Sequence, residues 1–387
     1  MSTAPRIMVA LPYGSSIGYA IGRLIRPFLE AACRVSGSHD HVHFCFGRID
    51  GTSEFLPKSF SNVVGIDIYG EDVREARKLE AYVMEHQIDT LFAFDLPVEA
   101  SILKRARRAG ITTVISYWGA SQSGFNSGLR LLMKRLEVRY LRPHRPDLYI
   151  FESHAMMRTA THGRGISTGH VMVVNTGVDP EVFKPKLGRE GVVYEVFGIP
   201  SERKVVVFMG HLTERKGVRV LLRAADHIVG SMERNDLHFL FLGNREGQEQ
   251  DFVEDFGPAV TGGLVTFGGY RTNIPELLTG CYVGCIPSNG WDSFPMSSLE
   301  MQACGLPVVV SDLQGTPETI EDGRSGVVVS VNDHVALAEA LTGLADDPIQ
   351  RDAYAEYARE RIVNGLTVGH QIDRLAYAMA RAVELKR

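Results

Sequence analysis

The sequence contains no apolar run approaching the roughly 20 residues that a membrane-spanning helix needs. It also contains no GxSxG nucleophile turn, no GxxxxGK(S/T) phosphate loop and no HExxH zinc motif. The sequence therefore gives no indication of the enzyme classes that use these motifs. Its five cysteines form no CxxC pair, which argues against a zinc site or disulfide framework and favours a reducing compartment. The N-terminal residues lead directly into a predicted strand rather than a signal peptide, so we expect a cytoplasmic protein.

The composition that remains is that of an ordinary globular protein, with 44% hydrophobic and 22% charged residues. A chain of 387 residues is too long for a single core, so two domains are expected. The net charge of −5 is unevenly divided: residues 1–190 hold 24 Lys and Arg against 19 Asp and Glu, and residues 191–387 hold 17 against 27. The basic first half suits an acidic or membrane-bound partner, and a solvated surface explains it about as well. We expect no nucleic-acid partner.

The first half alternates short apolar runs with helical stretches, as in a doubly wound α/β sheet. The runs are near-continuous rather than alternating, which indicates parallel strands buried on both faces. The predicted strands are Ile7–Leu11, His43–Phe46, Val63–Ile68, Thr90–Phe94, Thr112–Ser116, Leu148–Phe151 and Val171–Val174, with helices at 19–34, 74–86, 99–109 and 128–141.

The same alternation restarts after about residue 186 and predicts a second Rossmann-like domain. Its predicted strands are Lys204–Met209, His238–Leu242, Leu264–Phe267, Val283–Pro287, Leu306–Ser311 and Gly326–Ser330, with helices at 217–228, 273–279, 298–304, 317–321 and 335–346.

We therefore predict an N-terminal domain over residues 1–184 and a C-terminal domain over 185–366. The stretch from Asn175 to Pro185 is punctuated by Gly, Pro and Asn and is typical of a loop leading to a hinge. A final amphipathic helix, within 367–387, is expected to pack back toward the first domain. Ligands of open α/β sheets bind beyond the carboxyl ends of the strands, so the cleft between the two sheets is the expected site.

The segment from Pro287 to Val310 gathers two carboxylates, Asp292 and Glu300, around a hydroxyl-rich turn and a predicted helix N-terminus. Such an N-terminus suits a phosphate, and carboxylates accept hydrogen bonds from sugar hydroxyls. The pattern therefore favours a nucleotide-sugar. Ser297 and Glu300 also have the spacing of a capping box, which needs no ligand, and the local pattern leaves both interpretations open.

Two loops of the first half follow strands and are rich in small or aromatic residues. The loop containing Gly14 and Ser15 can bring backbone close to a phosphate or sugar, or form a plain tight turn. It is not a GxGxxG loop, and no acidic residue ends the second predicted strand as NAD binding would require. Aromatic faces pack on sugar rings, so Tyr117, Trp118 and Ser121 are candidate acceptor contacts; a Trp anchoring the loop fits equally well.

The helical stretch 127–145 is cationic on one side and apolar on the other. This pattern suits a membrane surface, although an ordinary amphipathic helix with a solvated basic face is the commoner cause.

Three loops of the second half also follow strands. In the first, Lys216 and backbone N–H groups could hold a diphosphate, and His211 could assist when protonated. The others, 241–247 and 267–271, could meet a nucleobase edge or, through Arg271, a phosphate. Each loop is a weak indication alone, and together with the Asp292–Glu300 segment they are stronger. No Asp-x-Asp pair is present, so we expect no metal and no cofactor.

These segments resemble the retaining glycosyltransferases of family 4, which have the GT-B fold of two Rossmann-like domains around a cleft. The matching residues are VVVFMGHLTERKGVRVLLRAA (205–225), HFLFLGN (238–244), VTFGGY (265–270), the stretch 286–329 and the interdomain segment VVNTGVDPEVFKP (173–185).

The resemblance implies that the domain over residues 1–184 binds the acceptor and that the domain over 185–366 binds the nucleotide-sugar donor. It also implies roles for single residues. The family's paired acidic motif falls on Asp292 and Glu300, so Asp292 would hold the donor sugar, Glu300 the ribose diol, and Lys216 the leaving diphosphate. Donors would be UDP- or GDP-sugars, and the acceptor a hydroxyl, lipid-linked or on an oligosaccharide. The other implied donor contacts are Gly14, Ser15, Gly210, His211, Arg215, Asn244, Tyr270, Arg271, Phe294, Met296, Ser297, Ser298 and Leu299.

The sequence departs from the family pattern at three positions. Asp292 replaces the first Glu, His211 replaces an Arg, and Trp118 stands where a His is usual. Pro295 also removes one backbone N–H from the sugar-binding loop. These departures keep two alternatives open, a sugar-nucleotide epimerase of the same fold and a non-catalytic nucleotide-sugar-binding subunit.

Overall fold

The computed structural model describes residues 4–386, which form two compact units. Unit 1 runs to Asn175 and resumes at Val368, and unit 2 spans Thr176–Thr367. The division thus falls nine residues before the predicted boundary at 184/185. Of the helices in the described part of the chain, none is both long and apolar enough to cross a membrane.

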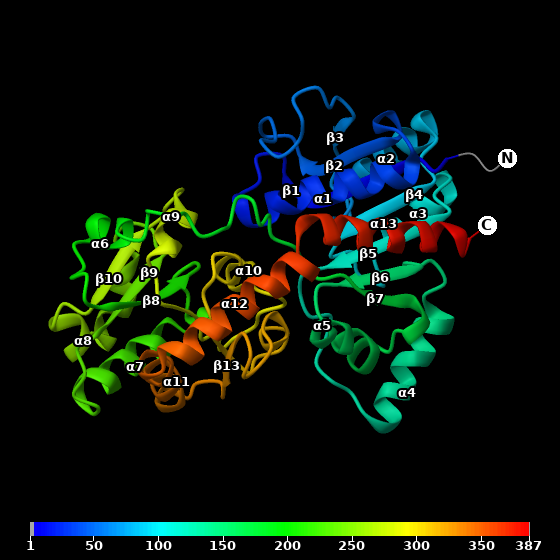
Figure 1. The fold of residues 1–387 in the computed structure, drawn as a ribbon. Helices are drawn as coiled ribbons and strands as arrows, with labels where there is room; N and C mark the ends of the chain where they lie inside the picture. Colours follow the sequence, from blue (N-terminus) through cyan, green and yellow to red (C-terminus); the bar gives the residue numbers. More distant parts are fainter. Residues whose placement is uncertain (1–3, 387) are drawn as a thin grey trace. The chain divides into compact units, whose positions relative to one another are not determined.

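Unit 1 is built on a seven-stranded parallel sheet in the order β3-β2-β1-β4-β5-β6-β7 (Figure 1). Its central strands are buried throughout, because they carry apolar side chains on both faces and helices cover both. The strands are β1 (Ile7–Gly14), β2 (Val42–Arg48), β3 (Val63–Gly65), β4 (Thr90–Phe94), β5 (Thr113–Trp118), β6 (Leu148–Phe151) and β7 (Val171–Val173).

The helices of unit 1 include the last helix of the chain, α13, which packs against α1 and β5 (Figure 1). A core cluster rich in aromatic residues joins α1, the sheet and α13 through residues such as Phe28, Phe92 and Met379. The helices are α1 (Tyr19–Ser36), α2 (Val73–His86), α3 (Ile102–Ala109), α4 (Gly128–Leu136), α5 (His154–Arg158) and α13 (Val368–Glu384), with the π-helical turns η2 (Glu137–Leu141) and η3 (Thr159–Arg164) and the 3₁₀ turns η1 (His39–His41) and η4 (Thr168–His170).

Unit 2 is built on a six-stranded parallel sheet in the order β10-β9-β8-β11-β12-β13. Its strands are β8 (Lys204–Met209), β9 (Leu237–Leu242), β10 (Val265–Gly269), β11 (Val283–Ile286), β12 (Val308–Ser311) and β13 (Gly326–Val329). Its helices are α6 (Val192–Phe197), α7 (Val218–Gly230), α8 (Pro258–Thr261), α9 (Ile274–Thr279), α10 (Met296–Ala303), α11 (His334–Asp346) and α12 (Pro348–Gly365), with the 3₁₀ turns η5 (Glu214–Lys216), η6 (Gln248–Asp255) and η7 (Pro317–Thr319).

All thirteen predicted strands are present, and the α/β class with two Rossmann-like domains is confirmed. The helices differ from prediction at several places: the stretch predicted over 317–321 is the 3₁₀ turn η7, and the short helices α5, α6 and α8 were not predicted. The helix predicted over 128–141 ends as α-helix at Leu136 and continues as the π-helical η2. The long helix α12 was not predicted, because its buried face consists of Ala355, Ala358 and Ile362, too few apolar residues to produce a clear periodicity.

Candidate functional site

A nearly buried ion pair lies at the carboxyl ends of two neighbouring strands of unit 2. The Lys216 ammonium contacts the Asp292 carboxylate at 2.6 Å, and their side chains are 16% and 8% exposed. Lys216 ends η5, which follows β8, whereas Asp292 lies in the loop between β11 and α10. The Ser288 hydroxyl donates to the same carboxylate oxygen at 2.8 Å, so Asp292 is held by two donors. Two residues that the sequence separates by 76 positions thus share one site.

The two loops approach so closely that a side chain is excluded between them. Gly217 has a φ of +74°, and a Cβ there would lie 1.8 Å from the Pro287 carbonyl oxygen. The N–H groups of Asn289 and Gly290 donate to the Arg215 carbonyl at 2.9 and 3.1 Å. Only glycine combines this backbone conformation with this contact, so Gly217 is required for the ion pair to form.

Arg215 strengthens the same junction. Its guanidinium donates to the Trp291 carbonyl at 3.1 Å and lies 4.3 Å from the centre of the Trp291 ring. Its position over the aromatic face is that of a cation–π contact. His211, four residues earlier in the chain, is exposed. Arg215, one of the cations implied at the diphosphate, is therefore already engaged in holding the loop.

Glu300 is buried, at 7% exposure, in the middle of α10. The helix begins at Met296 with Pro295 as its N-cap, and no side chain caps it. The capping-box interpretation is therefore wrong, because Ser297 lies inside the helix instead of preceding it. Glu300 therefore lies inside the helix, four residues after its first residue, and does not belong to a cap.

The segment before Glu300 contributes little side-chain surface. The side chains of Phe294 and Leu299 belong to the core, at 3% and 0% exposure. The Ser298 hydroxyl bonds to Thr319 at 2.8 Å and its N–H donates to the Pro295 carbonyl. Contacts from this segment to a ligand would thus come from backbone N–H groups or from the half-buried Met296 and Ser297.

The two glycine loops of unit 2 pack on one another. Gly243 has a φ of +106°, and a Cβ there would lie 2.6 Å from the Gly210 carbonyl oxygen. The Asn244 side-chain oxygen accepts from the Gly269 N–H at 2.7 Å. Arg271 donates to the Gly268 carbonyl, while Tyr270 is 69% exposed. Asn244 therefore ties the end of β9 to the end of β10, Arg271 is held by the strand that it follows, and Tyr270 presents its ring to solvent.

In unit 1 the Gly14–Ser15 loop is held by Asp50, which the sequence analysis missed. We expected no acidic residue at the end of the second strand, but β2 extends to Arg48 and Asp50 follows two residues later. Its carboxylate accepts from the Ser16 N–H at 2.8 Å and the Ser16 hydroxyl at 2.7 Å. The Ser15 hydroxyl accepts from the Asp50 and Gly51 N–H groups. Hydrogen bonds led by the Ser16 N–H hold the pKa of Asp50 well below its usual range.

The three candidate acceptor residues have different environments. Tyr117 is fully buried and donates to Glu152 at 3.1 Å, so its ring is part of the core rather than an accessible platform. Trp118 is half-buried against a second cluster and its Nε1 atom has no hydrogen-bond partner among the described residues. Ser121 is exposed. The structure keeps Trp118 and Ser121 as surface candidates and removes Tyr117.

Two carboxylates that directly follow strands, Asp95, which is half-buried, and Glu152, which is buried, were also missed. Asp95 directly follows β4 with a φ of +52°, and its carboxylate accepts from the Gly119 N–H at 3.1 Å. Burial raises the pKa of Asp95 to about 7. Glu152, 6% exposed, directly follows β6. The signal available in the sequence was the acidic residue immediately after each apolar strand, at Phe94-Asp95 and Phe151-Glu152.

Comparison with known proteins places the clearest similarity in unit 2. Residues 194–361 match the family model described as Glycosyl transferases group 1. A D-inositol 3-phosphate glycosyltransferase of Corynebacterium urealyticum is 31% identical over 224 residues, covering 55% of this chain and 51% of that protein. The UDP-Gal:alpha-D-GlcNAc-diphosphoundecaprenol alpha-1,3-galactosyltransferase of Escherichia coli is 26% identical over 208 residues, covering 53% and 52%. The chain thus spans about half the length of the curated relatives it matches.

Solved structures resemble the whole fold at low sequence identity. Anabaena Alr3699/HepE, solved in complex with UDP, has a TM-score of 0.78 and 18% identity, over 97% of this chain and all of that one. A glycosyltransferase from Rickettsia africae has a TM-score of 0.80 and 14% identity, over 98% and 99%. At these identities the likeness shows the fold.

Proposed function

We propose that this chain, whose residues 194–361 match the glycosyl transferases group 1 model and whose fold resembles that of solved GT-B structures, transfers a hexose-type sugar from a nucleotide-sugar to an acceptor hydroxyl with retention. The observation that carries the proposal is the Lys216–Asp292 pair at 2.6 Å, with Glu300 buried on the adjoining helix. It joins a cation for the diphosphate to a carboxylate for the sugar within one site. The solved Anabaena protein that resembles the fold binds UDP and UDP-glucose, which supports this class of donor.

In the proposed complex, Lys216 donates to a diphosphate oxygen while it keeps its contact with Asp292. An ammonium group has three N–H donors, so both contacts can coexist. Asp292 accepts from a hydroxyl of the donor sugar and Glu300 from the ribose diol. The free N–H groups at the start of α10 add partial positive charge to the same place. The proposed donor site thus uses only residues of unit 2.

The transfer step forms a bond between the acceptor oxygen and the anomeric carbon as the bond from that carbon to the diphosphate breaks. The acceptor proton passes to an oxygen of the departing diphosphate on the same face, which preserves the configuration. Lys216 stabilises the charge that develops on the leaving group, the kind of electrostatic contribution that dominates many enzymes. We propose that no metal takes part, because no Asp-x-Asp pair is present to hold one on the diphosphate.

We propose that the acceptor binds to unit 1, near Trp118 and Ser121. The product class we propose is a surface polysaccharide, a glycolipid or a small glycoside. We also propose peripheral contact with a membrane through unit 1.

The test is thermal stabilisation by UDP, GDP, dTDP and ADP, and then by their sugars, on the wild type, Glu300→Ala and Glu300→Gln. A ligand at 100 times its dissociation constant adds about 2.7 kcal/mol of stability. We expect one nucleotide to stabilise the wild type and both variants to lose that response. Glu300→Gln keeps the size of the side chain, so it separates a lost ligand contact from a packing defect.

Two outcomes would contradict the proposal. If no nucleotide stabilises the wild type, or if both variants keep the full response, the donor site is misplaced. Transfer to an added acceptor distinguishes the enzyme from a non-catalytic binding subunit. Interconversion of the donor without acceptor would instead identify an epimerase.

A further inference from the structure

The helix α4 exposes an apolar stripe to solvent. Leu129, Leu132, Met133 and Leu136 are spaced three and four residues apart and therefore share one face, and they are 47–71% exposed. None of the nine residues of α4, all of them described, is buried. Such a stripe normally packs on a core. Three large apolar residues close to α4 in the sequence, Phe125, Tyr140 and Leu141, are also exposed, each at 65–72%.

The concentration of this surface is unusual within the chain. Seven of the 23 large hydrophobic side chains that are exposed in the described residues fall between positions 125 and 141. Scattered exposed apolar residues need no explanation, whereas a contiguous group rimmed by charge marks an interaction site. We name the group Phe125, Leu129, Leu132, Met133, Leu136, Tyr140 and Leu141 the α4 apolar face.

A basic pocket of about 630 Å³ lies beside this face. Arg135, Arg139 and Arg145 line it together with the exposed hydroxyl of Thr168 and two histidines. In the described chain no carboxylate lies within ion-pair distance of these three arginines. The pocket is therefore positively charged and lined by hydrogen-bond donors.

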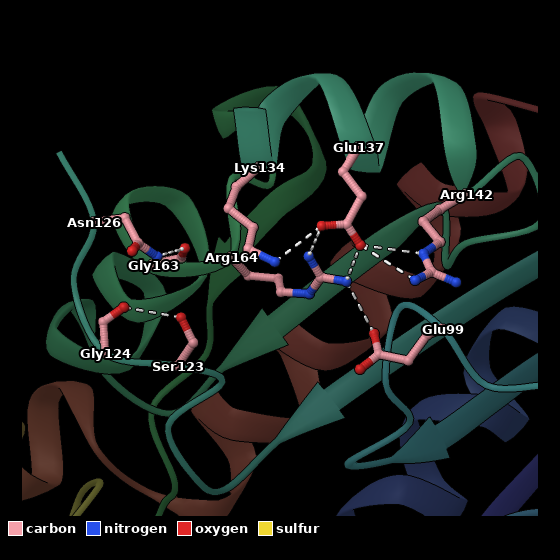
Figure 2. Close-up of polar contacts among 9 residues, drawn as sticks. All are labelled: Glu99, Ser123, Gly124, Asn126, Lys134, Glu137, Arg142, Gly163 and Arg164. Carbon is pink, nitrogen blue, oxygen red and sulfur yellow. Dashed lines mark hydrogen bonds and ion pairs between the residues drawn. The ribbon is translucent and has the colours of Figure 1, made fainter. Parts of the chain in front are cut away.

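The acidic residues nearest in sequence are already neutralised. Glu137 is bound by Arg164 at 3.0 Å, Lys134 at 3.0 Å and Arg142 at 3.2 Å, and Arg164 also binds Glu99 (Figure 2). These contacts, led by Arg164, lower the pKa of Glu137 to about 2. Since Glu137 stays ionised and is paired with these three cations, it does not neutralise the arginines that line the pocket.

The next carboxylate along the chain is paired as well. Asp147 binds Arg107 at 2.7 Å and Lys386 at 2.8 Å. Between positions 127 and 145 the chain has six Lys and Arg and a single Glu, a net charge of +5. A ligand that complements this surface would carry a negative charge beside apolar groups.

We propose that the α4 apolar face and the basic pocket together dock unit 1 on an anionic phospholipid surface, with a headgroup phosphate in the pocket and the apolar face among the acyl chains. The inference rests on, and makes specific, the membrane contact in the proposed function. A helix with apolar residues on one face and Lys or Arg on its flank lies in the plane of the interface in this way. Juxtamembrane cations are attracted to anionic leaflets. Arginine is the side chain best shaped for bidentate phosphate contact.

The experiment is cosedimentation of the full chain with vesicles of phosphatidylcholine alone or mixed with phosphatidylglycerol. We expect the wild type to bind the mixed vesicles and to bind pure phosphatidylcholine much more weakly. Arg135→Glu with Arg139→Glu removes pocket charge, and we expect binding to fall about tenfold or more. The matched control is Lys104→Glu with Arg108→Glu, two exposed cations on α3 in the same unit.

Apolar insertion is tested by Leu132→Gln with Met133→Gln, which we expect to weaken binding to the mixed vesicles by about tenfold. The control is Val73→Gln with Met84→Gln on α2, where both side chains are also at least half exposed. The pocket is tested by Thr168→Glu, which adds a carboxylate to its lining, with Thr168→Gln as the uncharged control. We expect only the charged variant to lose binding.

Three results would overturn the inference. They are equal binding of the wild type to both kinds of vesicle, equal loss in the control pairs, or full binding by Leu132→Gln with Met133→Gln. The nucleotide response of unit 2 is measured on the same samples. If vesicle binding fails while that response persists, the proposed transfer function stands without this docking surface; if the reverse holds, the docking surface stands without it.

Discussion

Replacing Lys216 with Met isolates the charge at the centre of the site. The substitution keeps an unbranched chain and removes the ammonium group that contacts Asp292 at 2.6 Å. Breaking a buried ion pair by removing one partner costs about 3–5 kcal/mol, because it leaves an uncompensated charge. Since the two side chains retain 16% and 8% exposure and Ser288 still donates to Asp292, we expect the lower end, about 3 kcal/mol.

That loss has a thermal signature. For a unit the size of unit 2, one kcal/mol corresponds to roughly 2–4 °C, so the melting transition of Lys216→Met should fall by roughly 6–12 °C. The double variant Lys216→Met with Asp292→Asn removes both charges, and we expect it to regain most of this loss. Differential scanning calorimetry of the wild type, both single variants and the double variant gives the coupling between the two residues.

The same series tests function. A hydrogen bond to a charged group contributes about 1.5–3 kcal/mol, so losing Lys216 should weaken nucleoside diphosphate binding roughly 10- to 100-fold. Binding of the nucleoside alone should change little, because it lacks the diphosphate. The reasoning is refuted if Lys216→Met melts with the wild type, if the double variant is no better than the single one, or if nucleoside and nucleoside diphosphate lose affinity equally.

Two further predictions concern the frame of the two units. Asp95 has a raised pKa of about 7, so between its ordinary pKa and about 7 the folded protein holds a proton that the unfolded chain releases, and stability falls as the pH rises through that window. Asp95→Asn should therefore unfold with the same free energy as the wild type near pH 4 and be more stable than the wild type by a few kcal/mol near pH 8. An equal difference in melting temperature at both pH values would contradict this. Gly217→Ala should cost about 3 kcal/mol or more, since its Cβ would lie 1.8 Å from the Pro287 carbonyl oxygen. The control is Gly343→Ala in α11, where a Cβ meets nothing within 4 Å, and it should gain roughly 0.5–1 kcal/mol in urea unfolding; equal losses at the two glycines would contradict the argument.

The sequence by itself determined the strands and the fold class, and it predicted the residues of the proposed donor site. Continuous apolar runs such as Thr90–Phe94 and Lys204–Met209 appear as strands with the predicted bounds, because a parallel strand buried on both faces leaves this pattern in any context. Glycines after strands marked the loops where Gly217 and Gly243 allow close approach. Both signals are local, so they can be recognised without knowing what lies opposite.

Only the tertiary structure decided which of these residues act together. The contact of Lys216 with Asp292 joins positions 76 apart, and the burial of Tyr117 depends on α1 and the neighbouring strands. The spacing allowed a cap at Ser297, but the helix begins at Met296 and places Ser297 inside it. The raised pKa of Asp95 and the exposure of the α4 apolar face are likewise invisible to periodicity. An apolar stripe has the same sequence whether or not a partner covers it, because burial is a property of the surroundings rather than of the segment.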